Sequence, residues 1–180
     1  MQTSTAKLSI NLENEVQTQN LATNLATVIF DIPNQEPSKL ISIINNLNQS
    51  IKGQIYLRGD LGAGKTCFTR AFLQACGVKG RIKSPSYTLV ESYKVSNLYL
   101  YHFDFYRFSD AHEWRDAGFD ELLAQDAISL IEWPEQAGGS LPAPDLDIHL
   151  EYAGDGRLAT LTAQSTKGKK WLTLLQTKTR

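Results

Sequence analysis

The residues best suited to chemistry in this 180-residue chain form one short run, Gly59–Thr66, which reads GDLGAGKT. The run matches the phosphate-binding pattern G-x-x-x-x-G-K-[ST] at every fixed position. Glycines at this spacing let backbone N–H groups approach phosphate oxygens, and the helix that follows directs its positive end at the same phosphates. In such a loop Lys65 contacts the β- and γ-phosphates, and the Thr66 hydroxyl binds Mg²⁺. The sequence therefore predicts a P-loop (Walker A) nucleotide site.

Two acidic residues lie at the ends of predicted strands, where a P-loop protein has the carboxylates that complete its metal site. Asp104 ends the predicted strand LYHFD, and Glu132 ends the predicted strand AISLIE. The carboxyl ends of strands in an open α/β sheet line the ligand crevice, so both carboxylates are expected beside the phosphates. A carboxylate in that place either binds Mg²⁺, directly or through water, or orients the attacking water. Asp104 and Glu132 are therefore the predicted catalytic residues.

The sequence favours ATP over GTP, because dedicated GTPases usually carry an Asn-Lys-x-Asp guanine-binding motif and this chain has none. A P-loop kinase that phosphorylates a small metabolite is the main alternative function. Kinases of that class usually close an arginine-rich lid over the phosphates, whereas residues 108–124 contain only Arg115. A nucleotide-gated binding module with negligible turnover is a third hypothesis.

The elements expected around these residues alternate between strands and helices, which is typical of an α/β fold. The expected strands are 54–58, 86–93, 98–105, 127–132 and a hairpin of 145–152 with 157–163. The expected helices are 38 to about 53, 65–76 and 113–124. We therefore predict a P-loop NTPase-like sheet, mostly parallel, with flanking helices and a C-terminal antiparallel hairpin.

The chain is expected to hold one domain with short extensions. Residues 1–30 are predicted to be an N-terminal extension, disordered or loosely packed, because residues 1–20 are rich in Gln, Asn and Thr and show no apolar stripe. Within it, residues 21–30 are predicted to form a strand or a short helix. The P-loop ATPase domain is expected to cover residues 31–163, and residues 164–180 are expected to be a tail or a short docked helix.

Charge and composition narrow the classes of function. The chain has 18 basic and 19 acidic residues and a formal net charge of −1, whereas proteins that grip RNA directly usually carry a basic excess. It has no apolar run long enough to cross a bilayer and no secretory pattern at its start, so we expect a cytoplasmic protein. Cys67 and Cys76 fall in one predicted helix with their Cα atoms roughly 13 Å apart, too far for a disulfide. Both are therefore expected to be reduced.

Four segments in a fixed order resemble one known family. They read GDLGAGKT (59–66), SPSYTLVE (84–91), YHFDFYR (101–107) and IEWPE (131–135). Together they are similar to the TsaE/YjeE family, the ATPase of bacterial tRNA threonylcarbamoyladenosine synthesis. The resemblance runs from about residue 32 to residue 163, and its four-part signature is far more specific than the P-loop pattern alone.

The resemblance implies a function that residue spacing alone does not. Members of the family work with TsaB and TsaD, which place a threonylcarbamoyl group on the adenosine beside the anticodon in tRNAs that read codons beginning with A. They hydrolyse ATP weakly by themselves, and the activity depends on the partner complex. The implied protein is a Mg²⁺-dependent accessory ATPase that meets tRNA only through its partners.

The resemblance also implies roles for individual residues. Thr66 and Glu132 would hold Mg²⁺, Asp104 would lie at the nucleotide, and Trp133 would lie close to the site. The implied nucleotide contacts are Leu61, Gly62, Ala63, Gly64, Lys65, Thr66, Asp104, Gln35 before the first helix, and Gly156 with Arg157 in the late hairpin.

Three further polar groups lie within these four segments: residues 84–88, His102 and Arg107. The resemblance implies that residues 84–88 form a switch-like loop over the phosphates, although Ser86 stands where the family usually has Thr. His102, between two aromatic residues of a strand, is interpreted as a packed, hydrogen-bonded histidine rather than a catalytic base. Arg107 either reaches phosphate or a partner protein, or pairs with an acidic residue on the surface.

Overall fold

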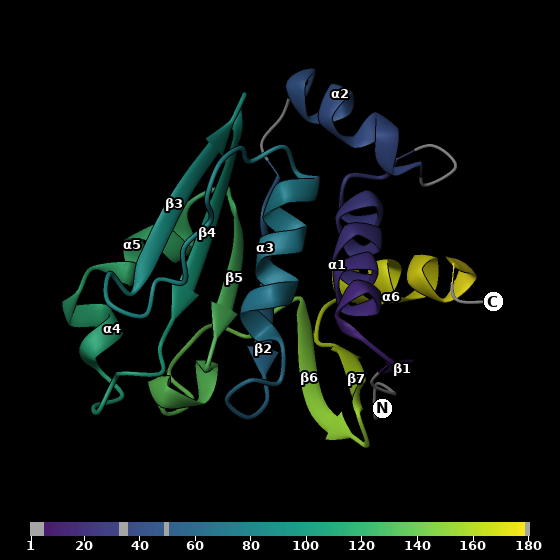
Figure 1. The fold of residues 1–180 in the computed structure, drawn as a ribbon. Helices are drawn as coiled ribbons and strands as arrows, with labels where there is room; N and C mark the ends of the chain where they lie inside the picture. The colour runs from purple at the N-terminus through teal and green to yellow at the C-terminus, as the bar shows by residue number, and fades with distance from the viewer. Residues whose placement is uncertain (1–5, 33–35, 49–50, 179–180) are drawn as a thin grey trace.

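The strands of the protein form one mixed sheet (Figure 1). The computed structural model describes residues 6–32, 36–48 and 51–178, and within them the sheet has seven strands in the order β1-β7-β6-β2-β5-β4-β3. The strands are β1 (Lys7–Leu12), β2 (Gly53–Arg58), β3 (Val90–Val95), β4 (Leu98–Asp104), β5 (Ile128–Glu132), β6 (Leu146–Ala153) and β7 (Gly156–Ala163). The helices are α1 (Glu15–Ile29), α2 (Leu40–Asn45), α3 (Lys65–Ala75), α4 (Glu113–Asp116), α5 (Phe119–Ala124) and α6 (Thr166–Lys178), with 3₁₀ turns η2 (Pro37–Lys39) and η3 (Pro134–Ala137).

The four central strands β6, β2, β5 and β4 run parallel, which brings their carboxyl ends to one edge of the sheet. The outer strands pair differently: β3 is antiparallel to β4, β7 to β6, and β1 to β7. Five of the seven described strands therefore point the same way. This arrangement confirms the predicted α/β sheet, mostly parallel, with a C-terminal antiparallel hairpin formed by β6 and β7.

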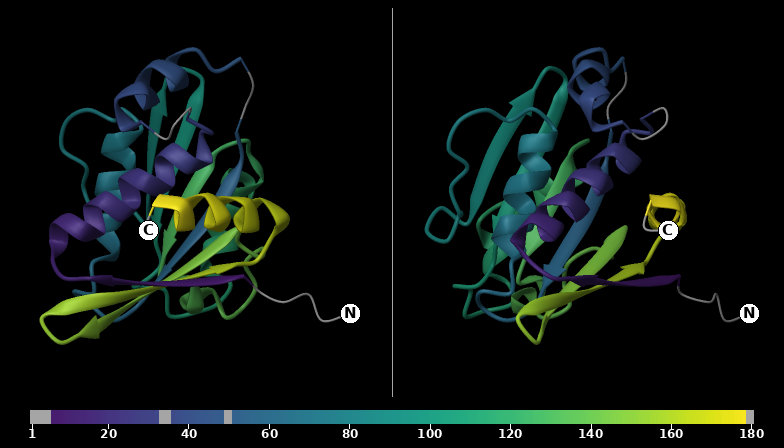
Figure 2. Two further views of the ribbon diagram at one scale, coloured as in Figure 1. Left: turned by 90° about the vertical axis from the view of Figure 1, so that its right-hand side faces the viewer. Right: turned by 45° about the vertical axis from the view of Figure 1, so that its right-hand side comes forward.

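The centre of the sheet is covered on both faces, as the nearly continuous apolar sequences of β2 and β5 require. Alternation along β4 sends Leu98 and Leu100 into one core and Tyr101 and Phe103 into the other. Helices α1, α2, α3 and α6 contribute to the first core, and α4 and α5 to the second. Figure 1 shows the two layers on either side of β4 and β5, and Figure 2 shows α1 and α6 together over β1.

Residues 6–30 differ from the disordered or loosely packed extension that their composition predicts. Residues 7–12 pair with β7 along the whole of β1, and residues 15–29 form the long helix α1. The helix buries Leu21, Ala22, Leu25, Ala26, Val28 and Ile29. The apolar periodicity of α1 is weak in the sequence because Thr18 and Thr27 also occupy buried positions of the helix. The apolar alternation of β1 is weak because Leu12 is its one fully buried residue.

Two other elements differ from the sequence prediction in length or number, and the tail, expected as a tail or a short docked helix, is a helix. The helix expected from residue 38 to about 53 is reduced to the turn η2 and the six-residue helix α2. The helix expected over 113–124 is divided into α4 and α5 by Gly118, whose φ of +75° is incompatible with a continuous helix. The tail forms α6, which docks on the first core through Trp171 and Leu175.

Two expectations from composition are met. Cys67 and Cys76 are both free thiols, the second buried in the core and the first half-buried near the start of α3. Burial raises the pKa of both thiols. Among the described residues, every helix is too short or too polar to span a bilayer.

Replacing Leu12 by alanine is expected to destabilise the protein, because this side chain at the end of β1 is only 3% exposed. A buried Leu→Ala change costs about 2–5 kcal/mol, which lowers the melting temperature of a domain of this size by roughly 4–20 °C. Thermal unfolding followed by circular dichroism measures the change. Val16→Ala, at a position of α1 that is 60% exposed, is the matched control and should have little effect. Equal melting temperatures for the two variants would contradict the docking of β1.

Candidate functional site

The P-loop joins the carboxyl end of β2 to the first turn of α3, as its motif requires. Three glycines of the loop have positive φ: Gly59 at +129°, Gly62 at +77° and Gly64 at +110°. A Cβ on Gly59 would lie 2.1 Å from the carbonyl oxygen of Leu150 in β6, so only glycine lets the loop pass this strand. Gly64 is the N-cap of α3 and makes no side-chain cap hydrogen bond. The N–H groups of the first helical turn therefore have no capping side chain over them.

Lys65 is held almost completely out of solvent at the first position of α3, with only 4% of the residue exposed. Its Nζ donates hydrogen bonds to the carbonyl oxygens of Gly59 (2.5 Å) and Asp60 (2.9 Å) and lies 3.9 Å from the centre of the Trp133 ring. Burial lowers the pKa of the Lys65 ammonium, and nearby carboxylates, chiefly Glu132, oppose that shift. The Lys65 ammonium therefore lies beneath the P-loop, between two backbone carbonyl oxygens of the loop and the face of the Trp133 ring.

The parallel register of β4 and β5 brings the two predicted acids side by side. Asp104 and Glu132 are register partners at the carboxyl ends of their strands, and both are buried. Paired residues of neighbouring strands point to the same face, so both carboxylates lie on the α3 side of the sheet. Thr66 donates a hydrogen bond from Oγ1 to Glu132 Oε2 at 2.9 Å. The two residues that the resemblance assigns to Mg²⁺ are therefore in direct contact.

Asp104 is surrounded by hydroxyl and N–H donors. The hydroxyls of Ser84 and Ser86 each lie 3.4 Å from its Oδ2 and 2.8 Å from each other, and Oδ1 accepts the backbone N–H of Tyr106 at 3.0 Å. Burial raises the pKa of the Asp104 carboxyl, and the hydrogen bond from Tyr106 opposes that shift. The strand expected from Ser86 begins only at Val90, so both serines belong to a loop at the site.

Trp133 directly follows Glu132 and turns back over the loop lysine. Its φ of +57° and ψ of +47° are left-handed, a conformation that a bulky residue keeps only when its surroundings hold it. The backbone N–H of Trp133 donates to the Leu57 carbonyl at 3.2 Å. The centre of its indole ring lies 4.9 Å from the centre of the Tyr106 ring. The strained backbone therefore lies at the site itself.

These groups enclose a cleft of about 370 Å³ over the P-loop. It is lined by Leu61, Gly62, Gly64, Lys65, Thr66, Cys67, Ser84, Ser86, Asp104, Tyr106, Arg107, Glu132 and Trp133. At the rim, the guanidinium of Arg107 lies 4.4 Å from the centre of the exposed Tyr87 ring. The cleft thus unites most of the residues that the sequence predicts for the site.

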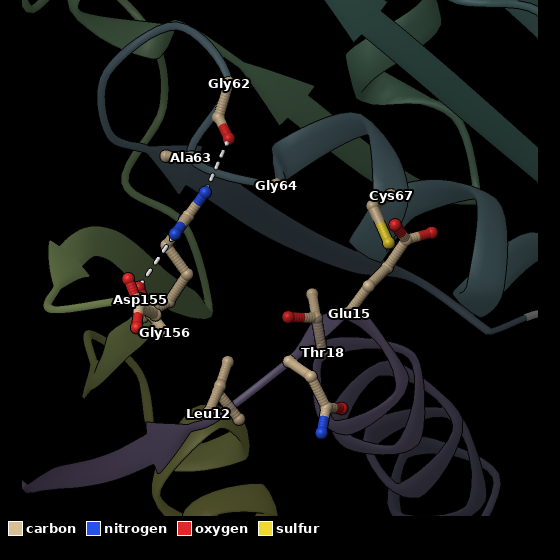
Figure 3. A pocket seen from close by; sticks show the side chains of 11 residues that line it. Leu12, Glu15, Thr18, Gly62, Ala63, Gly64, Cys67, Asp155 and Gly156 are labelled. Carbon is tan, nitrogen blue, oxygen red and sulfur yellow. Dashed lines mark hydrogen bonds between the residues drawn. The ribbon is translucent and has the colours of Figure 1, made fainter.

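A second pocket, of about 240 Å³, adjoins the cleft at the P-loop, and Figure 3 shows the residues that line it. Gly62, Gly64 and Cys67 line both spaces. The rest of the wall is formed by Leu12, Asn14, Glu15, Thr18, Ala63, Asp155, Gly156 and Arg157. Three sequence-predicted contacts, Ala63, Gly156 and Arg157, therefore lie at this pocket and not in the cleft. Gly156 packs so closely on β1 that a Cβ there would lie 2.4 Å from a backbone oxygen of that strand.

The hairpin β6–β7 holds the tip of the loop through two side chains. Arg157 donates from Nη2 to the Gly62 carbonyl at 3.3 Å, one of the dashed contacts in Figure 3. Its guanidinium lies 4.0 Å from the ring centre of Tyr152, whose hydroxyl donates to the Leu61 carbonyl at 2.9 Å. The loop is therefore fixed against the hairpin by bonds to two successive carbonyl groups.

Sequence reasoning missed the contribution of Asn14, Glu15 and Thr18 to the second pocket. A signal for them exists, because Asn14 is a favoured N-cap residue and Gln17 follows it at the spacing of a capping box. The Asn14 side chain accepts the N–H of Gln17 at 3.1 Å, and the Gln17 side chain accepts the backbone N–H of Glu13 at 2.9 Å. That pattern marks the start of α1. The predicted contact Gln35 lies outside the described residues.

Comparisons with known proteins agree with the sequence resemblance. The family model for the threonylcarbamoyl adenosine biosynthesis protein TsaE matches residues 12–159. Over 131 residues the chain is 43% identical to the tRNA threonylcarbamoyladenosine biosynthesis protein TsaE of Haemophilus influenzae, covering 73% of this chain and 83% of that protein. It is 37% identical to the protein of the same name from Bacillus subtilis, covering 72% of this chain and 82% of that protein.

A solved structure shares the fold. The crystal structure of YdiB from Bacillus subtilis matches with a TM-score of 0.72 at 26% identity and covers 98% of both chains. The residues that match the family model include α1, the P-loop and both strand-end acids. The chain therefore belongs to the TsaE family of tRNA threonylcarbamoyladenosine biosynthesis proteins.

Proposed function

We propose that this protein binds ATP with Mg²⁺ at the P-loop and hydrolyses it slowly alone, and faster with TsaB and TsaD, during threonylcarbamoyl modification of tRNA. The contact between Thr66 and Glu132 carries the proposal. It sets a hydroxyl of the P-loop helix 2.9 Å from a carboxylate at the end of a central parallel strand. A P-loop hydroxyl and a strand-end acid are the protein groups that hold the metal in P-loop ATPases. Family membership supplies the pathway.

The donors at the site suit Mg²⁺. A hydroxyl and a carboxylate are hard oxygen ligands, and Mg²⁺ commonly takes one or two carboxylates with phosphate oxygens and waters. Among the described residues no three His, Cys, Asp or Glu side chains gather in a way that could hold a metal. The ligands other than Thr66 and Glu132 would therefore come from the nucleotide and water. A Mg²⁺ ion held there would neutralise charge that develops on the phosphates.

The other side chains of the cleft have separate tasks in the proposed reaction. Lys65 supplies positive charge to the β- and γ-phosphates from beneath the loop. Asp104, held by the hydroxyls of Ser84 and Ser86, orients the attacking water. Trp133 covers the lysine and limits access of bulk solvent, which strengthens electrostatic interactions in the cleft.

The base and ribose of ATP are proposed to occupy the second pocket. It opens beside the same loop glycines that line the cleft, and its walls combine apolar and polar groups, as small-molecule sites do. This assignment agrees with the nucleotide contacts that the resemblance implies at Gly156 and Arg157. It adds Asn14 and Thr18, from the start of α1, to the proposed contacts.

Filling the second pocket should weaken binding of the nucleoside but not of the phosphates. Thr18 is buried in the pocket wall, so Thr18→Phe places a ring in the space for the base. We expect the affinity for ADP to fall by about tenfold or more, since each 1.4 kcal/mol of lost contact is tenfold. Calorimetry with ADP and with tripolyphosphate separates the two parts, and Val16→Phe on the exposed side of α1 is the control. An equal loss for both ligands would place the base elsewhere.

Phosphate release tests the dependence on partners. The isolated protein should hydrolyse ATP slowly, and TsaB with TsaD should raise the rate by well over tenfold, because contact with residues 84–88 can order the serines that hold Asp104. Replacing Ser84 and Ser86 together by alanine should reduce the stimulated rate more than the affinity for ATP. A flat partner titration with wild-type protein, with binding confirmed independently, would rule the mechanism out.

The metabolite-kinase alternative fits less well, and phosphate release separates the binding-module alternative. The one arginine of residues 108–124, Arg115, donates to the Ser140 carbonyl at 3.1 Å and packs on Trp114 in the second core, away from the cleft lining. Family membership also does not favour a metabolite kinase. A binding module without turnover would release no phosphate even with partners present. We expect the protein to act in the cytoplasm and to meet tRNA only through TsaB and TsaD.

A further inference from the structure

We infer that His102 is a positioning residue for Glu132, which it holds in place from inside the core. The inference rests on the proposed function, because it concerns the carboxylate proposed to bind Mg²⁺. It assigns the imidazole to the arrangement of the metal site and not to contact with the nucleotide.

The position of His102 in the sheet sets its reach. It lies in β4 two residues before Asp104, on the same face of the strand, and is fully buried. Its register partner in β5 is Leu130, so Glu132 stands two residues further along that strand. The imidazole of His102 reaches along the strands past Leu130, so that its Nε2 atom lies 2.8 Å from Glu132 Oε1.

The two oxygens of the Glu132 carboxylate therefore have different partners. Oε2 accepts the hydroxyl hydrogen bond of Thr66 on the side of the cleft, and Oε1 bonds to His102 on the side of the core. Only Oε2 faces the hydroxyl with which it would share Mg²⁺. The bond at Oε1 restricts rotation of the carboxylate, as hydrogen bonds to metal-binding carboxylates commonly do.

His102 has no second polar contact among the described residues, where its buried Nδ1 lacks a hydrogen-bond partner. Its cross-strand neighbour Glu91 instead accepts a bond from Thr88 at 3.0 Å. A carboxylate oxygen can only accept, so Nε2 carries the hydrogen of this bond. An apolar side chain would fill this place without an unpaired nitrogen, which is costly when buried. The bond to Glu132 accounts for a histidine here.

Three substitutions separate the hydrogen bond from the volume of the ring. His102→Gln carries an N–H donor near the place of Nε2, whereas His102→Asn is shorter and cannot reach Glu132. His102→Leu fills the space without a donor. The test uses Mn²⁺ in place of Mg²⁺, because its electron paramagnetic resonance signal measures binding to the protein–ADP complex without any turnover. Calorimetry with ADP in the absence of divalent cations measures nucleotide binding separately.

We expect His102→Leu and His102→Asn to weaken Mn²⁺ binding by about tenfold or more, within the range seen for groups that hold a metal ligand. His102→Gln should retain most of the wild-type affinity, and ADP binding without metal should change little in all three. If His102→Leu does not fold, the comparison of His102→Gln with His102→Asn decides.

The outcomes distinguish this inference from the proposed function. Wild-type Mn²⁺ affinity in His102→Leu and His102→Asn, or equal losses in His102→Gln and His102→Asn, would overturn the positioning role and leave the nucleotide site intact. A wild-type protein that binds neither ADP nor Mn²⁺ would overturn both.

Discussion

Replacing Lys65 by alanine is expected to weaken ATP binding by roughly a hundredfold or more. The ammonium group lies beneath the loop, bonded to two carbonyl oxygens and facing Trp133, and it is the single cationic side chain of Gly59–Thr66. Removing one partner of a buried, hydrogen-bonded charge pair costs about 2–5 kcal/mol, and about 2.8 kcal/mol corresponds to a hundredfold. The bound phosphates would lose this partner while remaining out of bulk solvent.

Titration calorimetry with ATP measures the effect, with Lys83→Ala as the control. Lys83 is an exposed lysine just before the serine-containing loop, so its removal changes the net charge equally without opening the cleft. Unchanged affinity in Lys65→Ala, with the control also unchanged, would remove the P-loop from the proposed function.

Replacing Glu132 by glutamine is expected to leave ATP bound and to reduce Mg²⁺-dependent hydrolysis by about a hundredfold or more, because a metal contributes several kcal/mol to the transition state. Glutamine has nearly the same shape, so packing against β4 is kept. Its amide is neutral and offers one oxygen, whereas the carboxylate bonds both Thr66 and His102 through separate oxygens.

Phosphate release with TsaB and TsaD present, at saturating ATP, measures this change. Glu135→Gln is the matched control, since Glu135 is a partly exposed acid three residues away that pairs with Arg58 at 3.1 Å. Equal rates in wild type and Glu132→Gln would require another ligand for the metal, with Asp104 the first to test.

Sequence alone predicted the centre of the fold well and its edge poorly. Strands β2 and β5 are buried on both faces, so their apolar runs are continuous and their ends carry the motif residues. Strand β1 is half-exposed, and Leu12 is its one fully buried residue. Its strand conformation depends on the backbone pairing with β7. Alternation over so few residues does not reveal a strand whose partner lies at the other end of the chain.

The candidate site likewise has one part that the sequence predicts and one part that only the folded structure reveals. Motif and strand ends predicted Lys65, Thr66, Asp104 and Glu132, because these residues lie within or next to local patterns. The part of the second pocket formed by Thr18 and its neighbours comes from a segment without such a pattern, and tertiary packing alone brings it to the loop. The hydrogen bond that His102 makes likewise depends on the register of β4 with β5, which no local pattern shows.

The pairing of β1 with β7 joins the two ends of the chain and so limits how the protein assembles during synthesis. Ser9 and Thr160, which face each other in this pairing, are 151 residues apart. The first strand and helix therefore leave the ribosome long before the strand that pairs with β1 has been made. The second pocket needs both Thr18 and Arg157, so a nascent chain lacks this proposed place for the base until almost the whole domain has emerged. ATP in the cell would then stabilise finished chains and not unfinished ones, because a ligand stabilises only the state that binds it.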